Sequence, residues 1–141
     1  MSTADVFSLA NQFVMPMWLL MIFAPKWKVT RWLIDYKVFP LALAVLYLTY
    51  LIISINSGGM SMDFGSLEGV KGLFTVDEAI LVGWVHYLAF DLVVGMWMLD
   101  QNRDLGIHPI LMAPSLLATF MLGPVGLILF MLLKAIKKSK L

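Results

Sequence analysis

Two side chains that can carry protons, His86 and Asp91, lie within an apolar segment that extends from residue 79 to residue 99. At about 1.5 Å per residue, a helix of this length crosses a hydrocarbon core of about 30 Å, so the segment is typical of a membrane span. A carboxylate near the centre of a span costs at least about 2.5 kcal/mol on insertion scales, and its presence needs a reason. An imidazole and a carboxyl group in an apolar pocket supply a base and an acid for proton transfer.

The spacing of these two side chains also predicts how they are oriented. Five residues correspond to about 140° around a helix, so we expect no direct bond between them and either two different neighbours or two walls of one cavity. One interpretation makes both side chains structural, with hydrogen bonds to Asn11, Tyr47 or Thr119. The other gives at least one of them a role in catalysis. The sequence leaves both interpretations open.

The composition of the chain is that of a membrane protein. Of its 141 residues, 61% are hydrophobic and 13% are charged, and the mean hydropathy is +0.89. Soluble domains carry about 25% charged residues. The chain has no cysteine, which excludes disulfides and thiolate chemistry. A net charge of +1, with basic residues at the borders of the apolar segments, argues against a nucleic-acid partner.

Four apolar segments predict an all-α fold, an integral membrane four-helix bundle that forms a single domain over residues 1–141. We expect spans at residues 6–24, 38–56, 79–99 and 110–133. The first segment lacks a signal-peptide cleavage pattern, and we expect it to be retained. Four spans would place both termini on one side and half of the basic residues at each membrane face, which leaves the orientation open.

Polar and helix-breaking residues fall at similar depths in the predicted spans, among them Asn11, His86, Gly123 and Pro124. Polar side chains within spans turn toward other helices or a cavity, because lipid offers them no hydrogen bonds. The pattern therefore predicts one buried polar pocket. Trp84 and Tyr87 share a helix face with Asp91 and are suited to bind a flat, conjugated lipid. The expected substrate-binding residues are Trp84, Tyr87, Asn11, Gly123 and Pro124.

Other chemistries fit the sequence less well. His86 and His108 lie at different depths and are poor candidates for a pair of haem ligands. The histidines and acidic residues lack metal-ligand spacing, and neither a phosphate-binding glycine motif nor a serine nucleophile elbow occurs. The absence of an inverted repeat disfavours a transporter. We expect no metal and no cofactor.

Several stretches resemble the abscisic-acid-deficient-four-like membrane family, and together they extend over nearly the whole chain. They are residues 24–27, 65–70, 84–92 with Gly95, and 123–127. The most specific is the run from 84 to 92. Plant members of this family are associated with neoxanthin synthesis, so the resemblance implies a small four-span protein of carotenoid-bearing membranes. The implied reaction converts the epoxide end group of violaxanthin to an allene with a tertiary alcohol.

Opening an epoxide needs an acid at its oxygen, and forming the allene needs a base for a vinylic proton. The resemblance thus implies a membrane-embedded xanthophyll isomerase that uses no cofactor, in which Asp91 is the acid and His86 the base, or the reverse. The alternative is a non-catalytic carotenoid- or lipid-binding protein or an accessory subunit.

For both functions, the expected partners are a carotenoid or another isoprenoid lipid and the membrane itself. A homo-oligomer or a larger membrane complex is left open. The expected location is a bacterial inner membrane or, in a phototroph, a thylakoid-type membrane.

Overall fold

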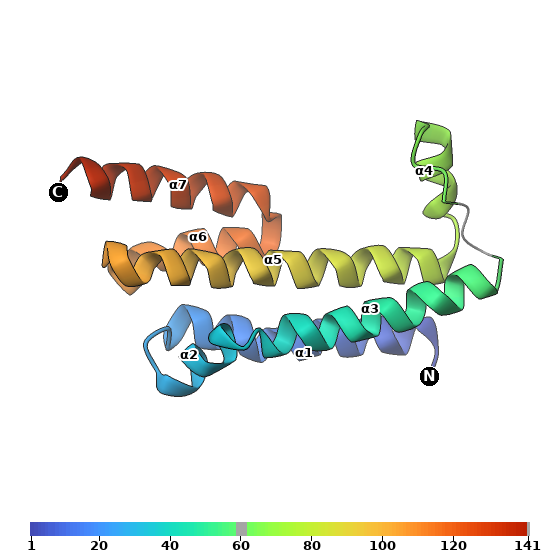
Figure 1. Cartoon of the computed structure of the whole chain (residues 1–141), viewed down its shortest axis with the longest axis horizontal. Coiled ribbons are helices and arrows are strands. Elements are labelled where there is room, and N and C mark those ends of the chain that lie inside the picture. The colour runs from blue at the N-terminus through green and yellow to red at the C-terminus, as the bar shows by residue number, and fades with distance from the viewer. Residues whose placement is uncertain (59–61, 141) are drawn as a thin grey trace.

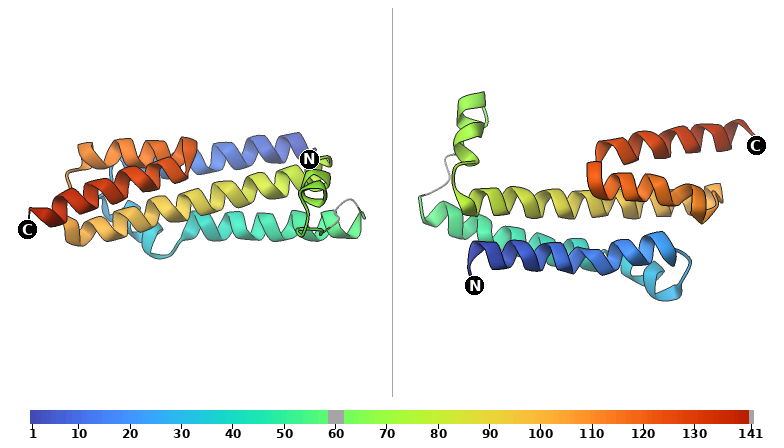
Figure 2. Two further views of the ribbon diagram at one scale, coloured as in Figure 1. Left: turned by 90° about the horizontal axis from the view of Figure 1, so that it is seen from above. Right: turned by 180° about the vertical axis from the view of Figure 1, so that it is seen from behind.

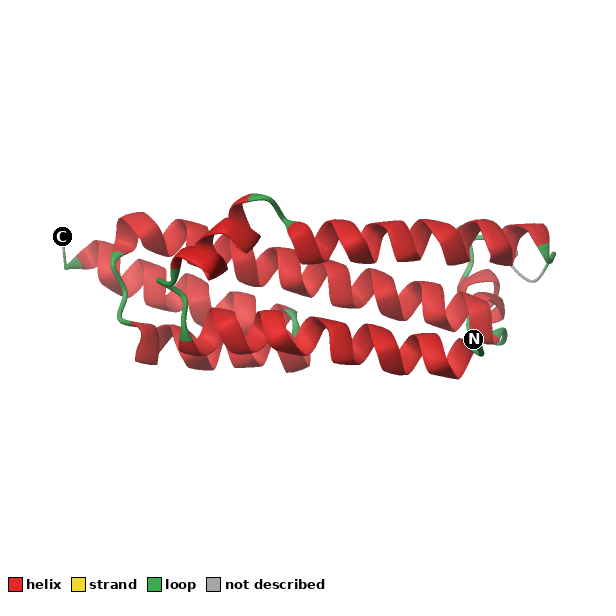
Figure 3. Ribbon diagram, turned by 90° about the horizontal axis from the view of Figure 1, so that it is seen from below, coloured by secondary structure: helices red, strands yellow, loops and turns green. Residues whose placement is uncertain are grey.

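The computed structural model describes residues 1–58 and 62–140, which form seven helices and no strand (Figure 1, Figure 3). The all-α prediction is therefore confirmed. The helices are α1 (Thr3–Phe23), α2 (Lys28–Asp35), α3 (Val38–Asn56), α4 (Leu67–Leu73), α5 (Asp77–Leu105), α6 (Pro109–Leu122) and α7 (Pro124–Ser139).

The long helix α5 lies at the centre of the molecule. The helices α3, α1 and α6 each pack along a different side of it, and α7 packs on α6 and α5 (Figure 2). Three helices, α1, α3 and α5, are long and apolar enough to cross a membrane. They coincide with the first three predicted spans. The indole ring of Trp18 in α1 packs on Gly95 of α5, where a Cβ atom would lie 2.8 Å from Cη2 of Trp18.

The predicted fourth span over residues 110–133 is not one continuous helix, because this segment forms two helices that run in opposite directions. The chain reverses after Leu122, and α7 returns along α6 (Figure 1). With 14 residues, α6 is about 21 Å long, against about 44 Å for the 29 residues of α5. We name α6 and α7 together the hairpin. The described residues thus form three long helices and a short hairpin, and a bundle of four spans is not confirmed.

The reversal follows from residues 123 to 126. Gly123 has a φ of +38°, a conformation that a side chain would strain, and its N–H caps α6 by donating to the carbonyl of Thr119. Pro124 then begins α7, where a missing N–H costs nothing. At Gly126, a Cβ atom would lie 2.3 Å from the backbone nitrogen of Thr119 and 2.5 Å from the carbonyl oxygen of Ser115. Glycine here lets the two helices pack backbone to backbone.

The hairpin places the two termini at opposite ends of the molecule (Figure 1). Asn11 of α1 bonds to Trp84 near the start of α5, whereas Lys134 of α7 bonds to Gln101 near the end of α5. The equal division of basic residues between two faces is therefore also wrong. Of the ten Lys and Arg residues, only Lys71 lies at the end that holds the N-terminus. The other nine lie at the opposite end: Lys26, Lys28, Arg31, Lys37, Arg103, Lys134, Lys137, Lys138 and Lys140.

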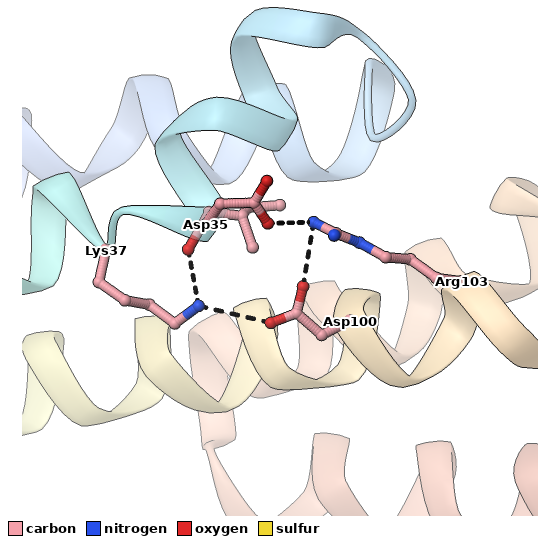
Figure 4. Close-up of polar contacts among 5 residues, drawn as sticks. Asp35, Lys37, Asp100 and Arg103 are labelled. Carbon is pink, nitrogen blue, oxygen red and sulfur yellow. Dashed lines mark hydrogen bonds and ion pairs between the residues drawn. The ribbon is translucent and has the colours of Figure 1, made fainter.

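An ion-pair network joins the end of α5 to the connection between α2 and α3 (Figure 4). Arg103 pairs with Asp35 and, at 3.2 Å, with Asp100, and Lys37 pairs with Asp100 at 3.4 Å. The Lys37 ammonium also donates to the carbonyl of Ile34 at 2.6 Å, within a turn where Lys37 itself has a φ of +51°. Such partly exposed pairs contribute about 1 kcal/mol or less each, so the network orients α2 more than it stabilises the fold.

Candidate functional site

The Asp91 carboxylate lies at the tip of the hairpin, halfway along α5. Its Oδ1 atom is 2.8 Å from the position that a Cβ atom of Gly123 would occupy. Its Oδ2 atom is buried and makes no hydrogen bond of regular geometry with the described residues, and the Tyr87 hydroxyl lies beside the same carboxyl group. A buried carboxyl oxygen that lacks a regular hydrogen bond is costly in an apolar environment. Asp91 thus presents its carboxyl group beside Tyr87 at the point where the hairpin turns.

Tyr87 and Trp84 continue from Asp91 along the same face of α5, at intervals of four and three residues. The Tyr87 hydroxyl donates to the carbonyl of Met121, at the end of α6, at 3.3 Å. The Trp84 indole N–H donates to Oδ1 of Asn11 at 2.9 Å. The ring of Trp84 also lies 5.3 Å from the rings of Tyr87 and of Phe7. Each ring is therefore held by a neighbouring helix.

Six of the seven sequence-predicted site residues lie together on this side of α5. We name this group the tip site. It consists of Asn11, Trp84, Tyr87, Asp91, Gly123 and Pro124. The hairpin ends beside Tyr87 and Asp91, so Trp84 and Phe7 keep 37% and 38% of their surface exposed. The result is an aromatic wall with one carboxyl group at its inner end.

His86 lies on another side of α5, facing α3. Its ring stacks on Phe90 at 4.7 Å and lies 5.8 Å from the ring of Tyr47. It lines a separate cavity of about 420 Å³ between α3, α4 and α5, and Asp91 does not line that cavity. The described residues thus do not form the single buried polar pocket expected from the sequence. His86 and Asp91 face two different neighbours and not two walls of one cavity.

The other polar residues of the spans also do not converge on one pocket. The hydroxyls of Thr49 and Thr119 donate to the carbonyls of Val45 and Ser115, four residues back on their own helices. Helical hydroxyl groups commonly satisfy themselves in this way, which a depth count along a sequence does not reveal. Thr119 packs against Gly126 within the hairpin and therefore does not meet Asp91.

Two residues of the site were not expected from the sequence. The ring of Phe7 packs against that of Trp84, and Met121 accepts the Tyr87 hydrogen bond through its backbone carbonyl. A backbone acceptor gives no signal in side-chain types. Among the described residues, no group of three or more His, Cys, Asp or Glu side chains could hold a metal ion.

The motifs of the sequence also match known proteins. A family model described as ABA DEFICIENT 4-like matches residues 5–130. Protein ABA DEFICIENT 4, chloroplastic, of Arabidopsis thaliana is 26% identical over 139 residues, which cover 94% of this chain and 62% of the relative. The chain therefore spans less than two thirds of the length of that relative. No solved structure matches. Because the family model covers most of the sequence, including the tip site, the chain belongs to the ABA DEFICIENT 4-like family.

Proposed function

We propose that this chain isomerises the epoxide end group of a xanthophyll within a membrane, and that Asp91 at the tip site performs the proton transfers. Membership of the family and similarity to a chloroplast protein support a carotenoid-related substrate. The observation that carries the chemistry is the Asp91 carboxyl group, with its buried Oδ2 atom, at the end of an aromatic wall.

In the proposed reaction, a protonated Asp91 gives its proton to the epoxide oxygen. The bond between this oxygen and the ring carbon that bears the polyene breaks, and the oxygen becomes the tertiary alcohol. Loss of the proton from the adjacent vinylic carbon then forms the allene. The Asp91 carboxylate takes up this proton, so the enzyme returns to its starting state and the product is an isomer of the substrate.

A single carboxyl group suits this reaction because its two oxygens can serve the two steps. The expected partner base, His86, faces α3 and a different cavity, about 140° around the helix from Asp91. We therefore assign both transfers to Asp91. The rings of Trp84 and Tyr87 provide a flat apolar surface for the conjugated chain next to the reacting end group.

The test compares Asp91→Asn with His86→Gln in membranes that contain an epoxy-xanthophyll, with products separated by chromatography. General acid–base catalysis contributes about 10²- to 10⁴-fold, so Asp91→Asn lowers turnover by at least about 100-fold, whereas His86→Gln keeps it within a few-fold. Equal insertion of both variants is checked by membrane fractionation. An active Asp91→Asn variant contradicts the proposal, and loss of turnover in His86→Gln alone restores histidine as the base.

A second candidate function is pigment binding without chemistry. It is favoured by the exposed aromatic wall of Phe7 and Trp84, which offers a binding surface that does not involve the carboxyl group. In this case the purified wild-type protein retains a carotenoid but forms no isomer, and Asp91→Asn retains as much pigment as the wild type. Absorbance spectra of the purified proteins separate the two functions.

A further inference from the structure

A cationic pocket lies at the end of the molecule opposite to the N-terminus, between the α1–α2 turn and the α5–α6 turn. Its volume is about 220 Å³, and its polar lining includes Lys26, Arg31, Arg103 and His108. None of its lining residues among those described is acidic. We name it the cationic pocket. It shares no residue with the tip site.

The charges of this pocket are only partly neutralised by the protein. Arg103 pairs with Asp35 and Asp100 on its other side. Lys26 and Arg31 take part in no ion pair or side-chain hydrogen bond with the residues that the structure describes. Two free cations beside a third, in one pocket, favour binding of an anion.

His108 adds a directed donor to the cationic pocket. Its Nδ1 atom accepts the backbone N–H of Ile110 at 3.2 Å and so caps the start of α6. In the neutral ring this bond leaves the proton on Nε2, so the imidazole can still donate to a ligand. The pocket therefore combines positive charge with a hydrogen-bond donor fixed by the helix it caps.

An apolar groove starts where the cationic pocket ends. It lies between α1 and α6, has a volume of about 500 Å³ and is lined by apolar residues throughout its described lining, among them Ile22, Phe23, Ile110 and Ala113. The linings adjoin in sequence twice. Phe23 of the groove is two residues from Pro25 of the pocket, and Ile110 of the groove follows the pocket residue Pro109. A polar head site thus lies next to an apolar groove.

The level of the pocket along the molecule matches that of lipid headgroups. It lies at the end of α1 and α5, both of which are long and apolar enough to cross a membrane. The aromatic side chains of Trp27, Trp32 and Tyr36 at the same end are exposed. Exposed aromatic rings beside basic residues are typical of the boundary between headgroups and acyl chains.

We propose that the cationic pocket and the groove together bind one anionic membrane lipid. Lys26, Arg31 and His108 bind the phosphate or sulfonate of the headgroup, and one acyl chain lies between α1 and α6. Charge complementarity selects the headgroup, and the apolar lining of the groove selects a lipid over a free anion. This binding does not depend on the reaction at the tip site.

The test measures lipid retention by the full-length protein with native mass spectrometry, using phosphatidylglycerol and, as a neutral reference, phosphatidylcholine. The wild type retains phosphatidylglycerol preferentially. In the variant Lys26→Gln/Arg31→Gln, the ratio of retained phosphatidylglycerol to phosphatidylcholine falls by at least about tenfold, since each basic residue near a membrane surface contributes appreciably to anionic lipid binding. The matched variant Lys28→Gln/Lys138→Gln removes two charges outside the pocket and keeps the preference.

Two further experiments distinguish the headgroup of a bound lipid from a free anion. Ala113→Phe, which narrows the groove, lowers phosphatidylglycerol retention, and inorganic phosphate at millimolar concentration does not displace the lipid. Displacement by phosphate together with unchanged retention in Ala113→Phe overturns the lipid proposal in favour of a free-anion site. Equal retention of both lipids, or equal losses in the two charge variants, also overturns it. Thermal unfolding of each variant in detergent shows that the fold is intact.

Discussion

The Oδ1 atom of Asp91 lies 2.8 Å from the point that a Cβ atom on Gly123 would occupy. The candidate acid and the reversal of the hairpin are therefore coupled through one glycine. No side chain fits between the carboxylate and the backbone, so the position of the tip determines the surroundings of Asp91.

We expect Gly123→Ala to destabilise the protein by about 1–3 kcal/mol, because it combines a strained backbone with a contact to Asp91. The measurement is thermal unfolding in detergent. The control is Gly123→Ala in an Asp91→Ala background, which keeps the backbone strain and removes the contact with the carboxylate. An equal loss of stability from Gly123→Ala in the two backgrounds would show that the contact with Asp91 contributes nothing.

The hydrogen bond between Trp84 and Asn11 ties α5 to α1 at the aromatic wall. We expect Asn11→Leu and Trp84→Phe to cost about 1–3 kcal/mol each, because each leaves a polar partner unpaired. The double variant should cost less than the sum, by about 1 kcal/mol, since no unpaired group remains. A double-mutant cycle on the free energy of unfolding measures this coupling. Strict additivity would mean that the bond does not stabilise the wall.

The short helix α4 should respond to acid through Asp63. The Ser66 hydroxyl and the Gly65 N–H donate to its carboxylate, which lowers the pKa of Asp63 below its ordinary value of 3.8. A lowered pKa stabilises the folded segment above 3.8, and this contribution is lost as the pH falls through the lowered pKa. We expect the Gly69 amide, which donates to Ser66, to lose protection from hydrogen exchange in that range.

The control for this acid response is Asp63→Asn, which should show at every pH the weaker protection that the wild type shows only in acid, and therefore no transition. Exchange rates are corrected for their intrinsic pH dependence. A transition of the same size in Asp63→Asn would assign the acid response to another group.

The hairpin predicts that the two termini lie on opposite sides of the membrane. Nine of the ten basic residues lie at the C-terminal end, so by the distribution of Lys and Arg this end faces the cytoplasm in a bacterial membrane. The side of the membrane on which each terminus lies can be measured with reporter fusions that are active in only one compartment. We expect a C-terminal fusion to report the cytoplasm and an N-terminal fusion to report the other side. Identical reports from both fusions would favour four spans.

Hydrophobicity and helix period were enough to predict the three long helices. The second predicted span, 38–56, has the bounds of α3, whereas α5 extends beyond its predicted range by including polar residues at both ends. The helical period also predicted that Trp84, Tyr87 and Asp91 lie on one face of α5 and that His86 lies on another. Local patterns of this kind depend on spacing alone.

The reversal at Gly123 could not be predicted in the same way. Residues 110–133 are apolar enough for a span, and a Gly-Pro pair fits a kinked helix as well as a turn. What decides between them is tertiary packing, because Gly126 lets α7 lie directly on the backbone of α6. The neighbours of Asp91 depend on this packing. The shape of the candidate site therefore could not be predicted from the sequence either.

A hairpin that returns to the end of the molecule from which it starts has a consequence for biogenesis in a membrane that α1, α3 and α5 cross. The residues after α5 need no transport of a polar terminus through the lipid, and the lysines of α7 can stay on the side where synthesis ends. Only the N-terminus and the connection between α3 and α5 have to be translocated. The last two helices can then dock from one side against α1 and α5 once these are inserted, which would complete the surroundings of Asp91 as the final step of assembly.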